Sequence, residues 1–451
     1  MSKLGQLWRL ARTYSQFHEN EKLIAWLRQQ RWVDWLTPQR RRWLLTLAAV
    51  IAGVMGTVNR YKDFRYDSSA KVWFVPIVTF LVLSAALYVL YLAAAHYQKL
   101  PALIKRRPQL SLHLIYWGFL TGLWFLPQDE GWWRSCLLLI AISGPFLIWR
   151  CGYLLMSGRR GKAQNTSFGA HWIYLWPIWG GTNTPIGKGW DYLSQCEAKT
   201  AEAYARSVLS AGRLLMLSVF LELARLCLRA ATDYCGIPRI KDIVTGKTEA
   251  SLAMTWLCLY LELIWDAASL AARGHRWVAA LRLFGFNVFR NTYKPLLAET
   301  IVDFWNRYYY YFKELLVEFF FYPTYLRFFR AWPKLRMFAA VFAAAFVGNM
   351  YYHFLQMRNP AAVGDLAEVA EGRSPRMIYC FILAVGIYLS MLRQQRRRGK
   401  VLHLGPAMER FARLRRIAGV WTFYALLNFW NLKTGFPVLE RVKVFLSFFG
   451  V

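Results

Sequence analysis

The sequence is poor in charged residues, and acidic residues are the scarcest of them. Only 18% of the 451 residues are charged, and 57 lysines and arginines stand against 25 aspartates and glutamates. Soluble domains carry about a quarter charged residues, so this composition disfavours a soluble fold. The basic clusters lie beside apolar runs, where a positive-inside bias and attraction to anionic headgroups explain them. We therefore expect no nucleic acid partner, in spite of a net charge of +32.

Several functional signatures are also missing. The seven cysteines are scattered and odd in number, without a CxxC pair or a Cys/His spacing that would indicate zinc or a disulfide framework. The fragment at Gly187–Trp190 completes no GxGxxG motif and follows no predicted strand. No internal repeat, low-complexity tract or cleavable signal peptide is visible. A metal enzyme and a dinucleotide-binding enzyme are both disfavoured.

Long apolar runs are what the sequence does have, with 57% hydrophobic and 17% aromatic residues. A membrane-spanning helix needs about 20 apolar residues. The sequence therefore predicts an all-α polytopic membrane protein. Nine spans are expected: Trp43–Val58, Val72–Ala95, Leu110–Leu126, Trp132–Trp149, Leu209–Ala230, Leu252–Ala272, Met337–Leu355, Met377–Leu392 and Ile417–Trp430.

The flanks of the spans predict three regions. Residues 1–42 alternate basic and aromatic residues and are predicted to form a cytoplasmic amphipathic segment, residues 43–431 a transmembrane domain, and residues 432–451 an interfacial helix. The loop charges place the N-terminus in the cytoplasm. They also imply that Leu297–Pro323 makes no simple crossing and re-enters from the cytoplasmic side, which requires a hollow around it.

The stretch from Phe286 to His353 concentrates polar groups within aromatic sequence. Such groups persist in an apolar setting where they line a cavity or take part in chemistry. A helix anchored at the membrane interface by tyrosines and charges is the alternative.

Three segments resemble one known family. The block GFNVFRNTYKPLLAETIVDFWNRYY resembles the pattern "GF…NF..PY.a.s..eFW.RWH" of the membrane-bound O-acyltransferases, in the bacterial branch of the teichoic-acid D-alanyl transferase and the alginate O-acetylation protein. Upstream, PIWGGTNTPIGKGWDYLSQ resembles the family's re-entrant segment, and downstream MFAAVFAAAFVGNMYYHF resembles the helix that ends in "WHG". The resemblance covers roughly residues 70–430. The matching positions are Phe286, Asn291, Pro295, Asp303, Phe304, Trp305 and Arg307 in the block, and Pro185, Ile186, Lys188 and Asp191 upstream.

The resemblance has two departures. Tyr309 stands where the family has the histidine of "RWH", and Tyr352 and Phe354 flank His353 in place of "WHG". Many eukaryotic members have asparagine at the first histidine, and Asn306 lies about three positions early.

The resemblance implies an MBOAT-like helical bundle with re-entrant segments around a central tunnel, and O-acyltransferase activity with His353 as general base. Histidine suits this role because its pKa lies near working pH. Asn349 lies four residues earlier, on the same helix face. The run Tyr308–Tyr311 supplies either a hydroxyl or an aromatic wall. The expected catalytic residues are His353, Asn349, Tyr309 and Asn306, and the expected tunnel residues are Trp305, Asp303, Tyr308 and Tyr352.

The expected donor is a thioester on coenzyme A or on the phosphopantetheine of an acyl carrier protein, which is the preferred partner because bacterial relatives often use one. Arg290, Lys294, Arg327 and Arg330 are expected to dock this acidic donor, or else only to set topology and bind anionic lipid. A bacterial inner-membrane location follows from the resemblance, and self-association stays open. A non-catalytic scaffold or channel of the same fold and an unrelated transporter are the competing functions.

Overall fold

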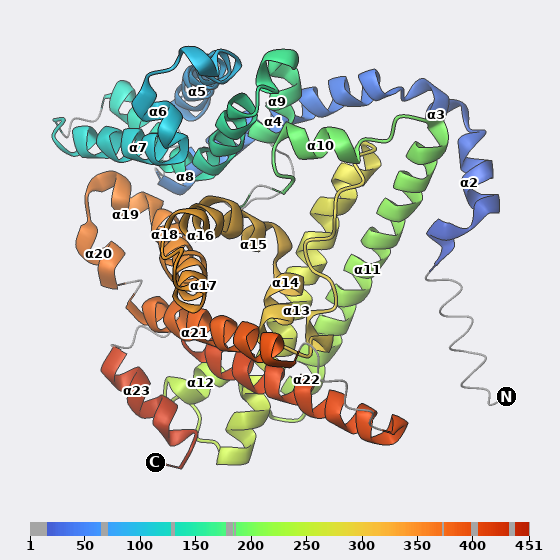
Figure 1. Ribbon diagram of the computed structural model, residues 1–451, viewed down its shortest axis with the longest axis vertical. Coiled ribbons are helices and arrows are strands. Elements are labelled where there is room, and N and C mark those ends of the chain that lie inside the picture. The colour runs from blue at the N-terminus through green and yellow to red at the C-terminus, as the bar shows by residue number, and fades with distance from the viewer. Residues whose placement is uncertain are drawn as a thin grey trace. The chain divides into compact units, whose positions relative to one another are not determined.

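The structure is a computed structural model that describes residues 16–64, 71–127, 131–176, 184, 186–371, 374–397, 405–432 and 438–450. Within these residues the chain forms helices and turns (Figure 1), and its only β-type pairing is an isolated bridge between Glu197 and Phe286. The predicted all-α class is confirmed. Six of the described helices are long and apolar enough to cross a membrane, so this is a helical membrane protein.

The six candidate spans coincide with six of the nine expected ones: Pro38–Lys62, Trp73–Ala95, Trp132–Arg159, Leu252–Leu283, Pro333–Leu355 and Pro375–Arg396. The other three expected spans are also helical but do not qualify among the described residues. Helix α7 has only 17 residues, whereas α11 and α22 carry several arginines. These helices are α7 (Pro108–Trp124), α11 (Ala201–Tyr234) and α22 (Pro406–Phe429).

Contacts divide the chain into two compact units. Unit 1 comprises the described residues of Met1–Met216, Arg276–Phe289 and Leu355–Leu366, and unit 2 those of Leu217–His275, Arg290–Phe354 and Ala367–Val451. Helices α11 and α13 (Leu252–Leu283) have residues in both. The sequence-based boundary at residue 42 falls inside helix α4 (Pro38–Phe64).

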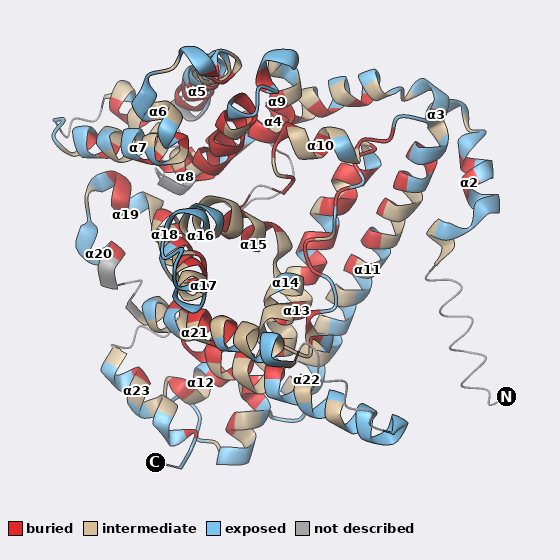
Figure 2. Cartoon of the chain, in the orientation of Figure 1, coloured by how far each residue is buried: buried red, intermediate tan, exposed pale blue. Residues whose placement is uncertain are grey.

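Unit 1 is built around helix α8 (Trp132–Arg159). In its most apolar stretch 83% of the residues are buried, against 28% in α4 and α5. Figure 2 shows α8 largely in red. Helices α5, α7 and α9 pack against α8. The described helices of unit 1 are α2 (Glu21–Arg28), α3 (Arg31–Trp35), α4, α5 (Lys71–Ala95), α6 (Ala102–Arg106), α7, α8, α9 (Phe168–Leu175), α10 (Trp190–Cys196) and α19 (Arg358–Val363), with parts of α11 and α13.

Part of the predicted N-terminal amphipathic segment packs on protein. Asn20 caps helix α2 by accepting hydrogen bonds from the amides of Lys22 and Leu23. Ile24 and Leu27 are buried against a cluster that includes Tyr204 of α11. The apolar face predicted at Leu4, Leu7, Trp8 and Ala11 lies outside the described residues.

A short junction ties two distant segments of unit 1 together. The amide of Ala198 donates to the carbonyl of Gly285 and the amide of Asn287 to that of Cys196, both at 2.8 Å. Gly285 has a φ of 83°, and a Cβ there would lie 2.9 Å from the guanidinium carbon of Arg41, so glycine is required. Phe286, one of the family-like positions, is fully buried here and has a structural role.

Unit 2 has one large apolar core. Its tightest aromatic contact stacks Phe304 on Tyr424, with ring centroids 3.7 Å apart. The described helices are α12 (Ile240–Val244), α14 (Ile301–Tyr308), α15 (Tyr310–Leu316), α16 (Tyr322–Arg327), α17 (Pro333–Phe342), α18 (Asn349–Leu355), α20 (Leu366–Glu371), α21 (Ser374–Arg397), α22 and α23 (Val438–Ser447), with parts of α11 and α13.

The predicted re-entrant segment Leu297–Pro323 is helical but broken. Helix α14 ends at Tyr308, the chain bends at Tyr309 with φ −141° and ψ 77°, and α15 then leads into a π-helical turn at Val317–Phe321. This break fits a segment that does not cross as one regular helix. Its re-entry into a membrane stays a prediction.

Candidate active site

His353 lies on a helix that changes its winding just before it. Helix α17 passes into a π-helix at Ala343–Gly348, and α18 follows from Asn349. Single π-helical turns are rare and often occur at functional sites. Gly348 packs on Phe320 of the other π-helix so closely that a Cβ there would lie 2.6 Å from the ring. Both irregular turns therefore meet one turn before His353.

Phe312 gathers four of the predicted site residues around one ring. It is buried on α15, and its ring centroid lies 4.6 Å from that of Tyr352 and 6.3 Å from that of His353. The rings of Tyr309 and Trp305 lie 5.5 and 6.1 Å from it. Trp305, Tyr309, Tyr352 and His353 therefore surround Phe312, and we call these five residues the Phe312 cluster.

Arg376, at the start of α21, reaches His353. Its Nη1 lies 3.3 Å from Nε2 of the imidazole. Arginine only donates hydrogen bonds, so Nε2 must accept and be unprotonated in this arrangement. His353 is half-buried, and the long contact is easily exchanged for one to another donor. The geometry gives His353 the proton-accepting nitrogen that a general base requires.

Asn349 is the least satisfied polar side chain of the site. It is only 1% exposed, and neither its amide nitrogen nor its oxygen has a hydrogen-bond partner among the described residues. An amide buried in this way costs about 1–3 kcal/mol. It lies on the same face of α18 as His353, four residues away. Unpaired donors beside a general base suit the binding of a transient oxyanion.

Further polar side chains lie between Arg376 and the core of unit 2. The Arg376 guanidinium lies over the ring of Tyr379, 5.8 Å from its centroid. Removal from water raises the pKa of the Tyr308 phenol well above its usual value, and the nearby Asp266 carboxylate and Tyr379 phenol raise it further. The Tyr308 phenol thus stays protonated. Asp266 itself lies 3.4 Å from the Asn428 amide.

Other predicted site residues lie elsewhere on α14. Asn306 is exposed, and Asp303 pairs with Arg307 at 2.8 Å on the surface of its own helix. Phe304 faces the core, so a residue two positions later faces about 200° away from it. Asn306 is therefore not brought into the Phe312 cluster, and Asp303 is engaged in a local ion pair.

The predicted docking residues form two basic pairs. Arg290 and Lys294 both lie over the ring of Tyr293, each 5.6 Å from its centroid. Arg327 and Arg330 are exposed around the end of α16, where Arg330 donates to the carbonyl of Leu326. Their exposure leaves the guanidinium groups accessible, and their role in docking stays a prediction.

Several family-like positions have structural partners. The Asn291 side chain accepts from the amide of Tyr311, and its carbonyl accepts from the amide of Tyr310. In unit 1, Asp191 accepts a 2.8 Å hydrogen bond from Ser157. Ile186 is buried and Lys188 lies over the ring of Tyr192, whereas Pro185 lies outside the described residues.

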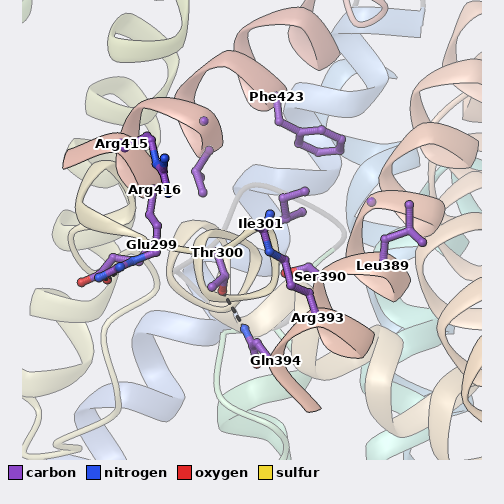
Figure 3. A pocket seen from close by; sticks show the side chains of 13 residues that line it. Glu299, Thr300, Ile301, Leu389, Ser390, Arg393, Gln394, Arg415, Arg416 and Phe423 are labelled. Atoms are coloured by element: carbon purple, nitrogen blue, oxygen red, sulfur yellow. Dashed lines mark hydrogen bonds and ion pairs between the residues drawn. The ribbon is translucent and has the colours of Figure 1, made fainter. Parts of the chain in front are cut away.

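Two of the cavities lined by described residues are large, and His353 lines neither of them. One, of about 460 Å³, is an apolar groove between α5, α7 and α8 in unit 1. The other, of about 520 Å³, lies between α14, α21 and α22 in unit 2 (Figure 3). The tunnel to His353 stays a prediction. No cluster of metal-binding side chains occurs in the described part of the chain.

Sequence reasoning missed Phe312, Arg376, Tyr379 and Asp266. The sequence does contain a signal for Asp266, because a carboxylate within an expected membrane span is a functional candidate by default. Arg376, directly before the span Met377–Leu392, had a weaker one. Phe312 looked like any other aromatic residue of its segment.

No known protein family matches the chain, and no curated protein is detectably similar to it.

Proposed function

We propose that this protein is a membrane-bound acyltransferase that transfers an acyl group from a cytoplasmic thioester to a hydroxyl acceptor. The supporting observation is the pairing of an accepting imidazole nitrogen on His353 with the unpaired buried amide of Asn349 on the same helix face. The donor is an acyl carrier protein or acyl-coenzyme A. The setting is the bacterial inner membrane, with the N-terminus in the cytoplasm.

The proposed reaction begins when the acceptor hydroxyl displaces Arg376 from Nε2 of His353. The imidazole takes the hydroxyl proton as the oxygen attacks the thioester carbonyl, a step worth about 10²–10⁴-fold. The Asn349 amide and the released Arg376 guanidinium donate to the developing oxyanion. Collapse of the tetrahedral intermediate breaks the carbon–sulfur bond, and the imidazolium returns its proton to the thiolate. The Phe312 cluster excludes water, which would otherwise hydrolyse the thioester.

The test is transfer of a radiolabelled acyl group in membranes that contain the His353→Ala variant. We expect transfer to fall by at least about 100-fold with normal membrane insertion. His96→Ala is the matched control, because His96 is exposed at the end of α5, and it should retain full transfer. Full transfer by His353→Ala would contradict the mechanism and favour a scaffold, channel or transporter.

A further inference from the structure

The cavity between α14, α21 and α22 carries a charge that nothing within it balances. Three arginines line it, Arg393, Arg415 and Arg416, against one carboxylate, Glu299. Glu299 is engaged by Arg416 at 2.7 Å and by Arg413 at 3.0 Å. Arg393 and Arg415 are exposed and form no ion pair with a described carboxylate. The cavity thus presents two guanidinium groups to a ligand.

The cavity is also divided between polar and apolar walls. Gln394 donates to Thr300 at 2.8 Å beside the arginines. Leu389, Val420 and Phe423 supply hydrocarbon surface. In Figure 3, Arg415 and Arg416 lie on one side and Leu389 on the other. Such a site fits a ligand with an anionic head and an apolar chain better than a free anion.

Two features indicate that the cavity lies at the boundary of the membrane. Arg393 comes near the end of the candidate span Pro375–Arg396, where an apolar helix becomes basic. The first half of α22 exposes Met408, Phe411 and Leu414, and the last two of these lie between arginines. Exposed apolar residues interleaved with arginines are typical of a helix at the headgroup level.

The cavity is separate from the candidate active site. Arg376, beside His353, and Arg393 lie 17 positions apart on α21, which corresponds to about 26 Å along a helix axis at 1.5 Å per residue. This approaches the roughly 30 Å thickness of a hydrocarbon core. A ligand in this cavity therefore occupies a site of its own.

We propose that this cavity binds the phosphate of an anionic phospholipid, with Arg393 and Arg415 holding the phosphate and the apolar wall holding the first part of an acyl chain. One guanidinium group binds two phosphate oxygens through two parallel hydrogen bonds. Basic pockets between membrane helices bind acidic headgroups. The acyl chains of a phospholipid reach the cavity from the surrounding bilayer, whereas a soluble donor such as coenzyme A makes no favourable contact with the apolar wall.

The test is native mass spectrometry of the full-length protein with phosphatidylglycerol or phosphatidylcholine. We expect one phosphatidylglycerol to be retained more tightly than phosphatidylcholine. The double variant Arg393→Gln/Arg415→Gln should weaken this binding by at least about tenfold, since charge-assisted hydrogen bonds are lost. Arg410→Gln, on α22 outside the cavity, should leave it unchanged.

A second variant fills the cavity without changing its charge. A Cβ at Gly419 meets no atom within 4 Å, so Gly419→Leu extends into open space and also favours the helix. It should abolish the retained lipid. Gly118→Leu, equally open on α7, is the matched control and should retain it. Equal binding of both lipids, undiminished binding by Gly419→Leu, or displacement of the lipid by coenzyme A would overturn the proposal.

Discussion

Two histidines, one in each unit, show how differently this protein treats a buried imidazole. His171 of unit 1 is fully buried, with Nε2 2.6 Å from Thr166 Oγ1 and Nδ1 3.0 Å from the Tyr174 hydroxyl. Because the Thr166 hydroxyl donates to Ala163, Nε2 of His171 donates and Nδ1 accepts. His353 of unit 2 is half-buried, with Nε2 3.3 Å from Nη1 of Arg376 and with aromatic rings around it.

Individual polar side chains of the two units differ in a similar way. In unit 1, Arg42 binds Glu197 through two nitrogens, and Arg282 donates to the carbonyl of Val288 and to Ser210. In unit 2, Asn349 has no partner among the described residues. Paired polar groups of this kind fix a fold, whereas an unpaired one such as the Asn349 amide has the capacity to bind something else. The chemistry that we propose therefore depends on Asn349 and His353 of unit 2.

The largest effect we predict concerns pH and His171. Burial lowers the pKa of His171 from 6.5 to about 4, so below pH 6.5 the unfolded state binds the extra proton. Stability is complete above pH 6.5 and falls as the pH drops toward 4, by about 3 kcal/mol at 1.36 kcal/mol per unit. Thermal unfolding of the purified protein between pH 4 and 7 measures this. His171→Gln should make the curve less steep, and an unchanged slope would contradict the prediction.

The next effect concerns the ion pair of unit 1. Glu197→Gln leaves the Arg42 charge without its partner and should lower stability by about 2 kcal/mol. This is less than for a fully buried pair, because the Arg42 side chain is 37% exposed. Unfolding in denaturing detergent measures the loss. Glu202→Gln, an exposed partner of Arg206, is the control and should change stability little.

Asn349 should respond in the opposite way. Asn349→Leu removes an unsatisfied amide, so stability should stay constant or rise by about 1 kcal/mol, while acyl transfer falls by about tenfold because an oxyanion donor is lost. Parallel measurements of unfolding and transfer distinguish the two effects. A loss of stability with unchanged transfer would show that Asn349 has a structural role, as Glu197 does.

The smallest effect concerns Arg376. Arg376→Lys keeps the charge but lacks the planar fork that reaches both Nε2 and an oxyanion. We expect transfer to fall roughly fivefold through kcat, with KM nearly unchanged. Stability should change by less than about 0.5 kcal/mol. A change confined to KM would point to a role in binding the substrate.

The sequence predicted the helical class, six of the candidate spans and the shared face of Asn349 and His353, because these depend on hydropathy and helix periodicity. Asn306 was chosen by its distance from a motif, although the helix period turns it away from the buried Phe304. Phe312 and Arg376 were out of reach, since their roles depend on how α15 and α21 pack against α18. Tertiary contacts of that kind leave no periodic pattern in one sequence.

The π-helix at Ala343–Gly348 has a consequence for how this site tolerates change in chain length. A wide turn accommodates one residue more than an α-helical turn, and each residue of an α-helix advances the direction of its side chain by about 100°. Deletion of one alanine there would restore regular winding of the helix, and the imidazole would keep its direction toward the Phe312 ring. The wide turn therefore absorbs a change of one residue, whereas a single insertion or deletion in the regular helix between Asn349 and His353 would turn the imidazole by about 100°.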